Sequence, residues 1–290
     1  MFVSLGRLRG FAPLLGAGIL GTVLSSAASP AEETKPAEDP PAAPQAAVDR
    51  PAQQAMRKLA AEVQFTLLAG ESTEARPLKL RPQPLVSYGD ETRFIKDSTL
   101  WVWLDGARPA LFQKLEVNDW VNGSPLWTWC FASAAPGLVE GAWPGITNRI
   151  RTKTQLTWNT VPEESVPENA TGWPLAARAL NRRFIVEDDT AVVLRPVARP
   201  ILEFKAPDQN VPYGAVFSHA RGTNPDFLLI LQVETTPAGE RRWSYAPVHM
   251  TSAGVTLKLN DQKVWADPPQ KPREVTNWGY FFTPRDPAIK

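Results

Sequence analysis

The chain matches itself without gaps at a spacing of 116 residues, which constrains its architecture more than any local pattern does. The matched pairs include Gly and Pro at predicted turns and Trp and Leu in predicted strands: Leu59/Leu175, Ala60/Ala176, Ala61/Ala177, Pro84/Pro200, Gly106/Gly222, Pro109/Pro225, Leu115/Leu231, Val117/Val233 and Trp127/Trp243. Self-similarity at one fixed spacing indicates that one supersecondary unit occurs twice. We expect a first repeat at residues 51–135, a connector at 136–167 and a second repeat at 168–266.

The N-terminal residues 1–28 have the pattern of a signal peptide. Arg7 and Arg9 form a basic head, residues 11–24 are uncharged and largely apolar, and Ser25-Ser26-Ala27-Ala28 offers a cleavage site after Ala27 or Ala28. The alternative is an uncleaved anchor, although the apolar run is shorter than the roughly 20 residues of a membrane span. We expect an exported protein, which is periplasmic, cell-envelope associated or secreted, with no transmembrane segment after signal removal.

Composition limits the partners and cofactors. Residues 29–50 are rich in Pro, Ala and acids, which is typical of a disordered linker. Loss of residues 1–28 would remove two arginines and no acid, leaving 29 basic and 30 acidic residues. Such a near-neutral body lacks the field that nucleic acid binding requires, so we expect no nucleic acid partner. The match to a dinucleotide fingerprint, at residues 16–21, falls within the predicted signal, and we expect no cofactor.

Local patterns predict a helix and a hairpin in each repeat. Apolar residues spaced by three and four favour a helix from Pro51 to about Gly70, and a second helix is expected from Pro174 to about Phe184. Strand-rich residues 99–104 and 110–117 flank Asp105-Gly106, a hairpin turn pair. Residues 215–220 and 227–234 form the matching hairpin, and 267–290 form a Pro-rich C-terminal tail. The predicted fold class is α+β, with two similar halves, each a helix packed on a curved antiparallel sheet.

Aromatic residues gather on one predicted face of each sheet. They are Trp101, Trp103, Trp127 and Trp129 in the first repeat, and Phe217, His219, Trp243 and Tyr245 in the second. We interpret these rings as core, covered by the helix of the same repeat. The alternative is an exposed platform that stacks on sugar rings. Trp120, Trp143 and Trp278 lie in loop-like surroundings and are the candidates for exposed, ligand-binding aromatics.

No catalytic or metal-binding motif stands out. The two histidines, His219 and His249, lack zinc-site spacing, so we predict no metal ligands and no catalytic residues. His219 matches Trp103 and is expected to be packed, whereas His249 ends a strand and is expected at the surface. Cys130 lies in an aromatic, strand-like run and is expected to be buried. Carboxylates cluster around the two hairpins and would serve a glycosidase only if two of them faced each other across a cleft. They are Asp97, Asp105, Glu116 and Asp119 at the first hairpin and Asp226 and Glu234 at the second.

The second hairpin carries a resemblance to a known group of proteins. Residues 216–231, which include Arg221-Gly222-Thr223-Asn224-Pro225-Asp226, and the later Trp243-Ser244-Tyr245-Ala246 resemble a signature of uncharacterised exported proteins of planctomycete bacteria. His219 and Arg221 depart from the usual pattern. The resemblance implies bacterial export and implies no activity.

These observations favour a non-catalytic exported binding or structural module of the cell envelope, which contacts an unknown protein or polysaccharide. One alternative is a carbohydrate-binding protein or a carbohydrate-active hydrolase with paired carboxylates, which requires a polar cleft holding two of them. Another is a small-molecule carrier, which requires an enclosed apolar cavity lined by both halves.

Overall fold

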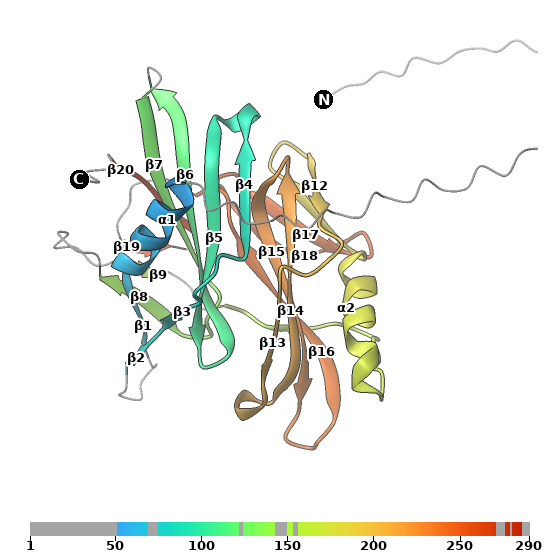
Figure 1. The fold of residues 1–290 in the computed structure, drawn as a ribbon. Coiled ribbons are helices and arrows are strands. Elements are labelled where there is room, and N and C mark those ends of the chain that lie inside the picture. Colours follow the sequence, from blue (N-terminus) through green and yellow to red (C-terminus); the bar gives the residue numbers. More distant parts are fainter. Residues whose placement is uncertain are drawn as a thin grey trace, which may run out of the picture. The chain divides into compact units, whose positions relative to one another are not determined.

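The computed structural model describes residues 51–68, 75–121, 124–142, 150–152, 156–270, 276–278 and 280–285. The chain divides into two units, Met1–Ala47 and Val48–Lys290, and all the described residues belong to the second unit. The predicted signal peptide and linker therefore lie outside the described residues. Figure 1 shows the fold.

Two α-helices and twenty strands form the described part of the chain. In the first half they are α1 (Pro51–Glu62), β1 (Gln64–Leu68), β2 (Arg76–Pro77), β3 (Lys79–Leu80), β4 (Val86–Asp90), β5 (Ile95–Asp105), β6 (Arg108–Val121), β7 (Ser124–Ser133), β8 (Leu138–Ala142) and β9 (Ile150–Thr152). The remainder are β10 (Asn159–Thr160), α2 (Trp173–Asn181), β11 (Phe184–Asp188), β12 (Val193–Pro196), β13 (Leu202–Ala206), β14 (Val211–Arg221), β15 (Asn224–Thr235), β16 (Arg241–His249), β17 (Val255–Leu259), β18 (Gln262–Asp267), β19 (Thr276–Trp278) and β20 (Tyr280–Arg285). Short 3-10 helices η1 (Glu91–Arg93), η2 (Ala170–Gly172) and η3 (Pro207–Gln209) link some of these elements.

The predicted fold class, α+β with a helix on each sheet, is wrong, because the described chain is mainly β. The first helix ends at Glu62, and the apolar residues after it alternate along β1, where Phe65 and Leu67 are buried. In the second half, Phe184 begins β11 instead of ending the helix. A helix rises less per residue than a strand, so helices of 12 and 9 residues cannot cover sheets whose strands have 11 to 14 residues. Short strands beside each helix cover the rest of the aromatic face.

The strands form three sheets. A six-stranded sheet contains β20-β7-β6-β5-β3 with β4 beside β5, and a five-stranded sheet has the order β19-β9-β8-β1-β2. In the second half the corresponding strands belong to one nine-stranded sheet with the order β10-β16-β15-β14-β12-β11-β17-β18, and β13 pairs with β14. The two hairpins expected from the sequence, β5–β6 and β14–β15, are confirmed.

Residues 116 apart occupy equivalent places in these ladders. Trp101 pairs with Gln113 in β5–β6, and Phe217 pairs with Leu229 in β14–β15. The turn glycines Gly106 and Gly222 both have positive φ, 62° and 69°. Phe94 and Asn210, which follow η1 and η3, are also left-handed, at 58° and 59°. The backbone thus follows the same course at matched positions, including its unusual conformations.

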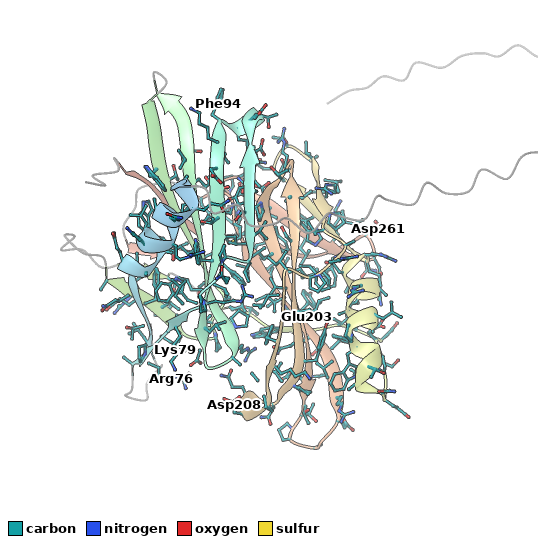
Figure 2. All side chains as sticks on the ribbon, viewed as in Figure 1. Arg76, Lys79, Phe94, Glu203, Asp208 and Asp261 are labelled. Carbon is teal, nitrogen blue, oxygen red and sulfur yellow. The ribbon has the colours of Figure 1, made fainter. Side chains whose placement is uncertain are left out.

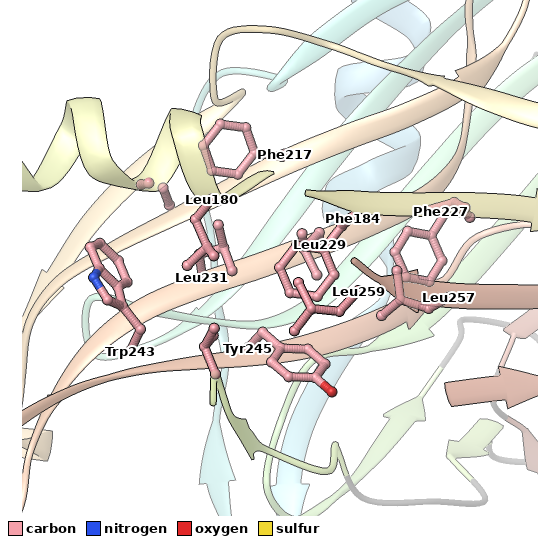
Figure 3. Packing of buried hydrophobic residues seen from close by; sticks show 14 of the residues in the cluster. Leu180, Phe184, Phe217, Phe227, Leu229, Leu231, Trp243, Tyr245, Leu257 and Leu259 are labelled. Atoms are coloured by element: carbon pink, nitrogen blue, oxygen red, sulfur yellow. The ribbon is translucent and has the colours of Figure 1, made fainter. Parts of the chain in front are cut away.

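Each large sheet has two buried faces. On one face, the rings of Trp101, Trp103, Trp127 and Trp129 pack with α1, β1 and β8 around Met56, Phe65 and Val139. Phe217, Trp243 and Tyr245 pack in the same way with α2, β11 and β17, and Figure 3 shows this cluster around Leu180, Phe184 and Leu257. The interpretation of the aromatic rows as core is confirmed, since each ring is at most 8% exposed.

The opposite faces of the two large sheets pack against each other. Leu100, Val102 and Phe112 from the first half form one apolar cluster with Val216, Leu228 and Ile230 from the second. Cys130 lies in this cluster and is buried, as expected. We call this contact the inter-half interface. Its ends, rather than the aromatic faces, place charged side chains close together.

Candidate functional site

The inter-half interface ends in two matched corners. At the η1 corner, the β14–β15 turn lies beside η1, and the hydroxyl of Thr223 donates a hydrogen bond to the carbonyl of Gly89. At the η3 corner, the β5–β6 turn lies beside η3, and Gln209 Nε2 donates to the carbonyl of Asp105 at 3.4 Å. Phe94 and Asp208 in Figure 2 mark these corners at opposite ends of the long strands.

The η1 corner is held by an ion pair between the two halves. Arg93, from η1, donates from two guanidinium nitrogens to the two carboxylate oxygens of Asp226, on β15, at 2.6 and 2.9 Å. The backbone N–H of Arg221 donates to the same carboxylate at 2.9 Å. Burial lowers the pKa of Arg93, but the hydrogen bonds and charge of Asp226 outweigh that effect and raise it. Arg93 therefore stays charged, and Asp226 has donors on both oxygens.

A buried lysine forms the second contact between the halves. Lys114, on β6, is 1% exposed, and its ammonium donates to Asn224 Oδ1 at 2.8 Å and to the carbonyl of Met250 at 2.7 Å. Both partners belong to the second half. The lysine thus ties β6 to the start of β15 and to the loop that follows β16.

Glu116 supplies a carboxylate on β6, two residues after Lys114. The hydroxyl of Tyr88 donates to Glu116 Oε1 at 2.8 Å. Burial, and then the charge of Glu116, raise the pKa of Tyr88 well above its usual value, so the phenol remains a donor. The other oxygen of this carboxylate, Oε2, makes no hydrogen bond with the described residues. It is also not one of the fully buried polar atoms of the described residues that lack a partner. This oxygen is therefore accessible to solvent.

The η3 corner shows that the fold does not require these charges. The residues 116 positions from Arg93, Lys114, Glu116 and Asp226 are neutral: Gln209, Ile230, Gln232 and Ala110. There Arg108 reaches Gln232 Oε1 at 3.1 Å, with no carboxylate replacing Glu116 or Asp226. Buried ion pairs gain little over apolar packing, because each charge must be desolvated. The η1 corner therefore carries four charged side chains at positions that are neutral at the η3 corner, whose own charged residues, Arg108, Asp105 and Glu234, stand at other positions. We take the η1 corner as the candidate functional site.

A cleft of about 260 Å³ opens at this corner. It is lined from both halves by Arg93, Ile95, Glu116, Thr128, Cys130, Asp188, Leu194, Arg221, Asn224, Asp226, Met250, Thr251, Ser252 and Ala253. The lining combines two arginines, three carboxylates, an amide and hydroxyls with a few apolar side chains. We call it the η1 cleft.

One wall of the η1 cleft is formed by β11 and the end of β14. Arg221 NH1 lies 3.1 Å from Asp188 Oδ2, and the Arg221 side chain is 54% exposed. Burial raises the pKa of Asp188, but hydrogen bonds from Thr190 and Val192 and the charge of Arg221 outweigh it and hold the pKa below the usual range. Asp188 is therefore an ionised group with its protein partners in place.

A further part of the lining is the loop after β16, which His249 anchors. The ring nitrogens of His249 face two acceptors, with Nδ1 2.8 Å from Asp267 Oδ2 and Nε2 2.7 Å from the carbonyl of Ala253. The ring is therefore held between β18 and the loop that follows β16. The expectation that His249 lies at the surface is wrong, since its side chain is buried. His249 ends β16, and Asp267 at the end of β18 lies against its ring.

None of the three tryptophans that the sequence offers as exposed aromatics has a described side chain. Trp143 lies outside the described residues, and Trp120 and Trp278 fall on β6 and β19, where only the backbone is described. His219 is fully buried, with Nε2 3.1 Å from Asn181 Oδ1, as its match to Trp103 led us to expect. Burial lowers the pKa of His219 to about 4, so it is neutral near pH 7.

The sequence contained one unused signal for the η1 cleft. At several positions related by 116 residues, one copy has a charged residue and the other has a neutral one. Examples are Arg93/Gln209 and Glu116/Gln232. Such a contrast at matched positions shows where the two corners differ.

Comparisons with known protein families, with curated proteins and with solved structures give no match. Within the described residues, no helix has the length and apolar character needed to cross a membrane. Nor do three or more His, Cys, Asp or Glu side chains of that part of the chain gather in a way that could hold a metal ion.

Proposed function

We propose that this protein is a non-catalytic, exported binding module of the cell envelope, and that it holds a small hydrophilic molecule in the η1 cleft. The observation that carries the proposal is the contrast between the corners, which places charges in the η1 cleft where the fold also accommodates neutral residues. The signal-like residues 1–28 and the resemblance to exported planctomycete proteins support the location.

The hydrolase alternative gains one supporting observation and meets one objection. Glu116, Asp188 and Asp226 line the same cleft, as paired-acid chemistry requires. However, Asp226 accepts three hydrogen bonds, and Asp188 is held by Thr190 and Arg221. Of the three carboxylates, Glu116 alone has an oxygen without a hydrogen bond to the described residues. A second, available carboxylate is therefore missing, which favours binding over hydrolysis.

The carrier alternative predicts an enclosed apolar cavity. The η1 cleft is lined by both halves, as a carrier pocket would be, but it opens to solvent, and charged and hydroxyl side chains stand among its apolar ones. We therefore expect a hydrophilic ligand rather than a lipid or an aromatic compound.

The test is a binding survey with the purified full chain. Isothermal calorimetry against sugars, amino acids and inorganic phosphate should find one class that binds the native protein. The matched variant converts these three positions of the η1 corner to the residues of the η3 corner, Arg93→Gln with Glu116→Gln and Asp226→Ala, and should bind that class markedly more weakly. Equal binding by this variant, provided that it unfolds cooperatively, would place the ligand elsewhere.

A further inference from the structure

The chemistry of the η1 cleft also indicates the class of ligand, an inference that rests on the proposed function. We infer that the η1 cleft binds a neutral, polyhydroxylated molecule of about the size of one sugar ring, with Arg221 and Asn224 as donors and Glu116 as the acceptor. Three properties of the cleft lead to this class.

The first property is that four of the five charged side chains of the walls are already paired with one another. Arg93 is paired with Asp226, and Arg221 with Asp188. Glu116 lies close enough to Arg93 to raise the pKa of that guanidinium. A ligand is therefore not needed as a counter-ion for these four paired groups. An anion would meet three carboxylates, and a cation would meet two guanidinium groups, so both would be repelled by part of the wall.

The second property is that hydrogen-bonding capacity of both kinds remains. Glu116 Oε2 is an accessible acceptor, and Asn224 Nδ2 is an accessible donor, because Lys114 occupies only the oxygen of that amide. Within the described residues, Arg221 uses one guanidinium nitrogen for Asp188, and the side chain is more than half exposed. A hydroxyl group both donates and accepts, so neighbouring hydroxyls on one ring satisfy such a set.

The third property is size. Pockets for drug-sized ligands are roughly 300–1,000 Å³. The η1 cleft, at about 260 Å³, lies just below that range, and it is open on one side. It therefore suits a single ring, either as a free sugar or as the terminal unit of a longer glycan that extends into solvent.

Calorimetry with the full chain tests the ligand class. The probes are glucose, galactose, mannose, N-acetylglucosamine and myo-inositol, and the contrasting probes are glycine, glutamate and inorganic phosphate. We expect saturable binding of at least one polyol and none of the charged probes. Binding of an amino acid or of phosphate without any polyol would overturn the ligand class and leave the proposed function standing. Binding of none of the probes would overturn both.

Substitutions locate the binding and separate neutral from charged recognition. Arg221→Ala should weaken polyol binding about tenfold or more, since hydrogen bonds from charged groups are the strongest available. Arg242→Ala, which removes an exposed arginine on β16, is the matched control and should have no effect. Glu116→Gln keeps an acceptor and should weaken a polyol by less than Glu116→Ala does. Loss of binding in the control as well, or no loss in Arg221→Ala, would overturn the assignment.

Discussion

Arg93 and Asp226 come from different halves of the chain and form a two-point ion pair, with N–O distances of 2.6 and 2.9 Å. The residues 116 positions away are Gln209 and Ala110, which form no ion pair. This single relationship joins the two halves, closes one side of the η1 cleft and distinguishes the two corners.

Replacing one member of this pair should destabilise the protein more than replacing both. Arg93→Gln leaves the buried Asp226 carboxylate with a single backbone donor, and we expect a loss of about 2–3 kcal/mol in the free energy of unfolding. The double variant Arg93→Gln with Asp226→Ala reproduces the η3 corner and should recover at least half of that loss. Urea unfolding measures both, and losses that simply add would contradict the interpretation.

Gly222 and Gly106 form a second matched pair that differs in surroundings. Both have positive φ, so an alanine at either position strains the backbone by about 1 kcal/mol. A Cβ at Gly222 would also lie 2.7 Å from Asp90 Oδ2, whereas a Cβ at Gly106 would meet nothing closer than 3.8 Å. Thermal unfolding should therefore show a larger loss for Gly222→Ala than for Gly106→Ala. Equal losses would indicate that the η1 corner is more open than the structure shows.

His219 should make stability depend on pH. Its folded-state pKa of about 4 lies below the roughly 6.5 of an unfolded histidine, because burial disfavours the charged ring. The unfolded chain therefore binds the proton more readily, so the contribution is fully present above pH 6.5 and is lost progressively down to pH 4, by about 3 kcal/mol. His219→Phe, which keeps an aromatic ring, should flatten this part of the stability profile. An unchanged profile would assign the acid sensitivity to other groups.

His249 should control the order of the loop that lines the η1 cleft. His249→Phe removes the contacts to Asp267 and Ala253, so amide exchange in residues 250–254 should accelerate while exchange in β14 stays unchanged. Asp267→Asn keeps an acceptor oxygen and should have a smaller effect. Faster exchange throughout the chain would instead mean that His249 stabilises the whole fold.

Phe94 has a left-handed backbone conformation that suits asparagine, the residue at the matched position 210, better than phenylalanine. Its φ is 58°, its side chain is 62% exposed, and the matched residue is Asn210 at 59°. Asparagine tolerates the left-handed region, so Phe94→Asn should raise the free energy of unfolding by about 0.5–1 kcal/mol. Chemical denaturation measures the gain, and a loss would show that the exposed ring makes a stabilising contact.

The hairpins were predictable from the sequence because their signals are local. Asp105-Gly106 marks one turn, and alternating side chains mark the strands around it. The predicted first helix was too long, because Val63 and Leu67 are four residues apart and fit a helix as well as one face of a strand. The fold class was wrong for the same reason, since β1, β8 and β11, which share the cover of the aromatic faces, were predicted as helix or loop.

The η1 cleft was beyond reach of local patterns because its members are scattered along the chain. Arg93 and Asp226 meet only when the two sheets stack face to face, and His249 is buried only because β18 lies across it. No spacing rule reports such a contact. Only the difference between the repeats carried information about it.

The pairing of β20 with β7 sets an order of events for a newly made chain. β7 precedes the whole second half, yet its outer neighbour is formed by Tyr280–Arg285. Until those residues have left the ribosome, β7 presents an open edge to any other extended polypeptide. A chaperone or a rapid late folding step would have to guard that edge during biogenesis.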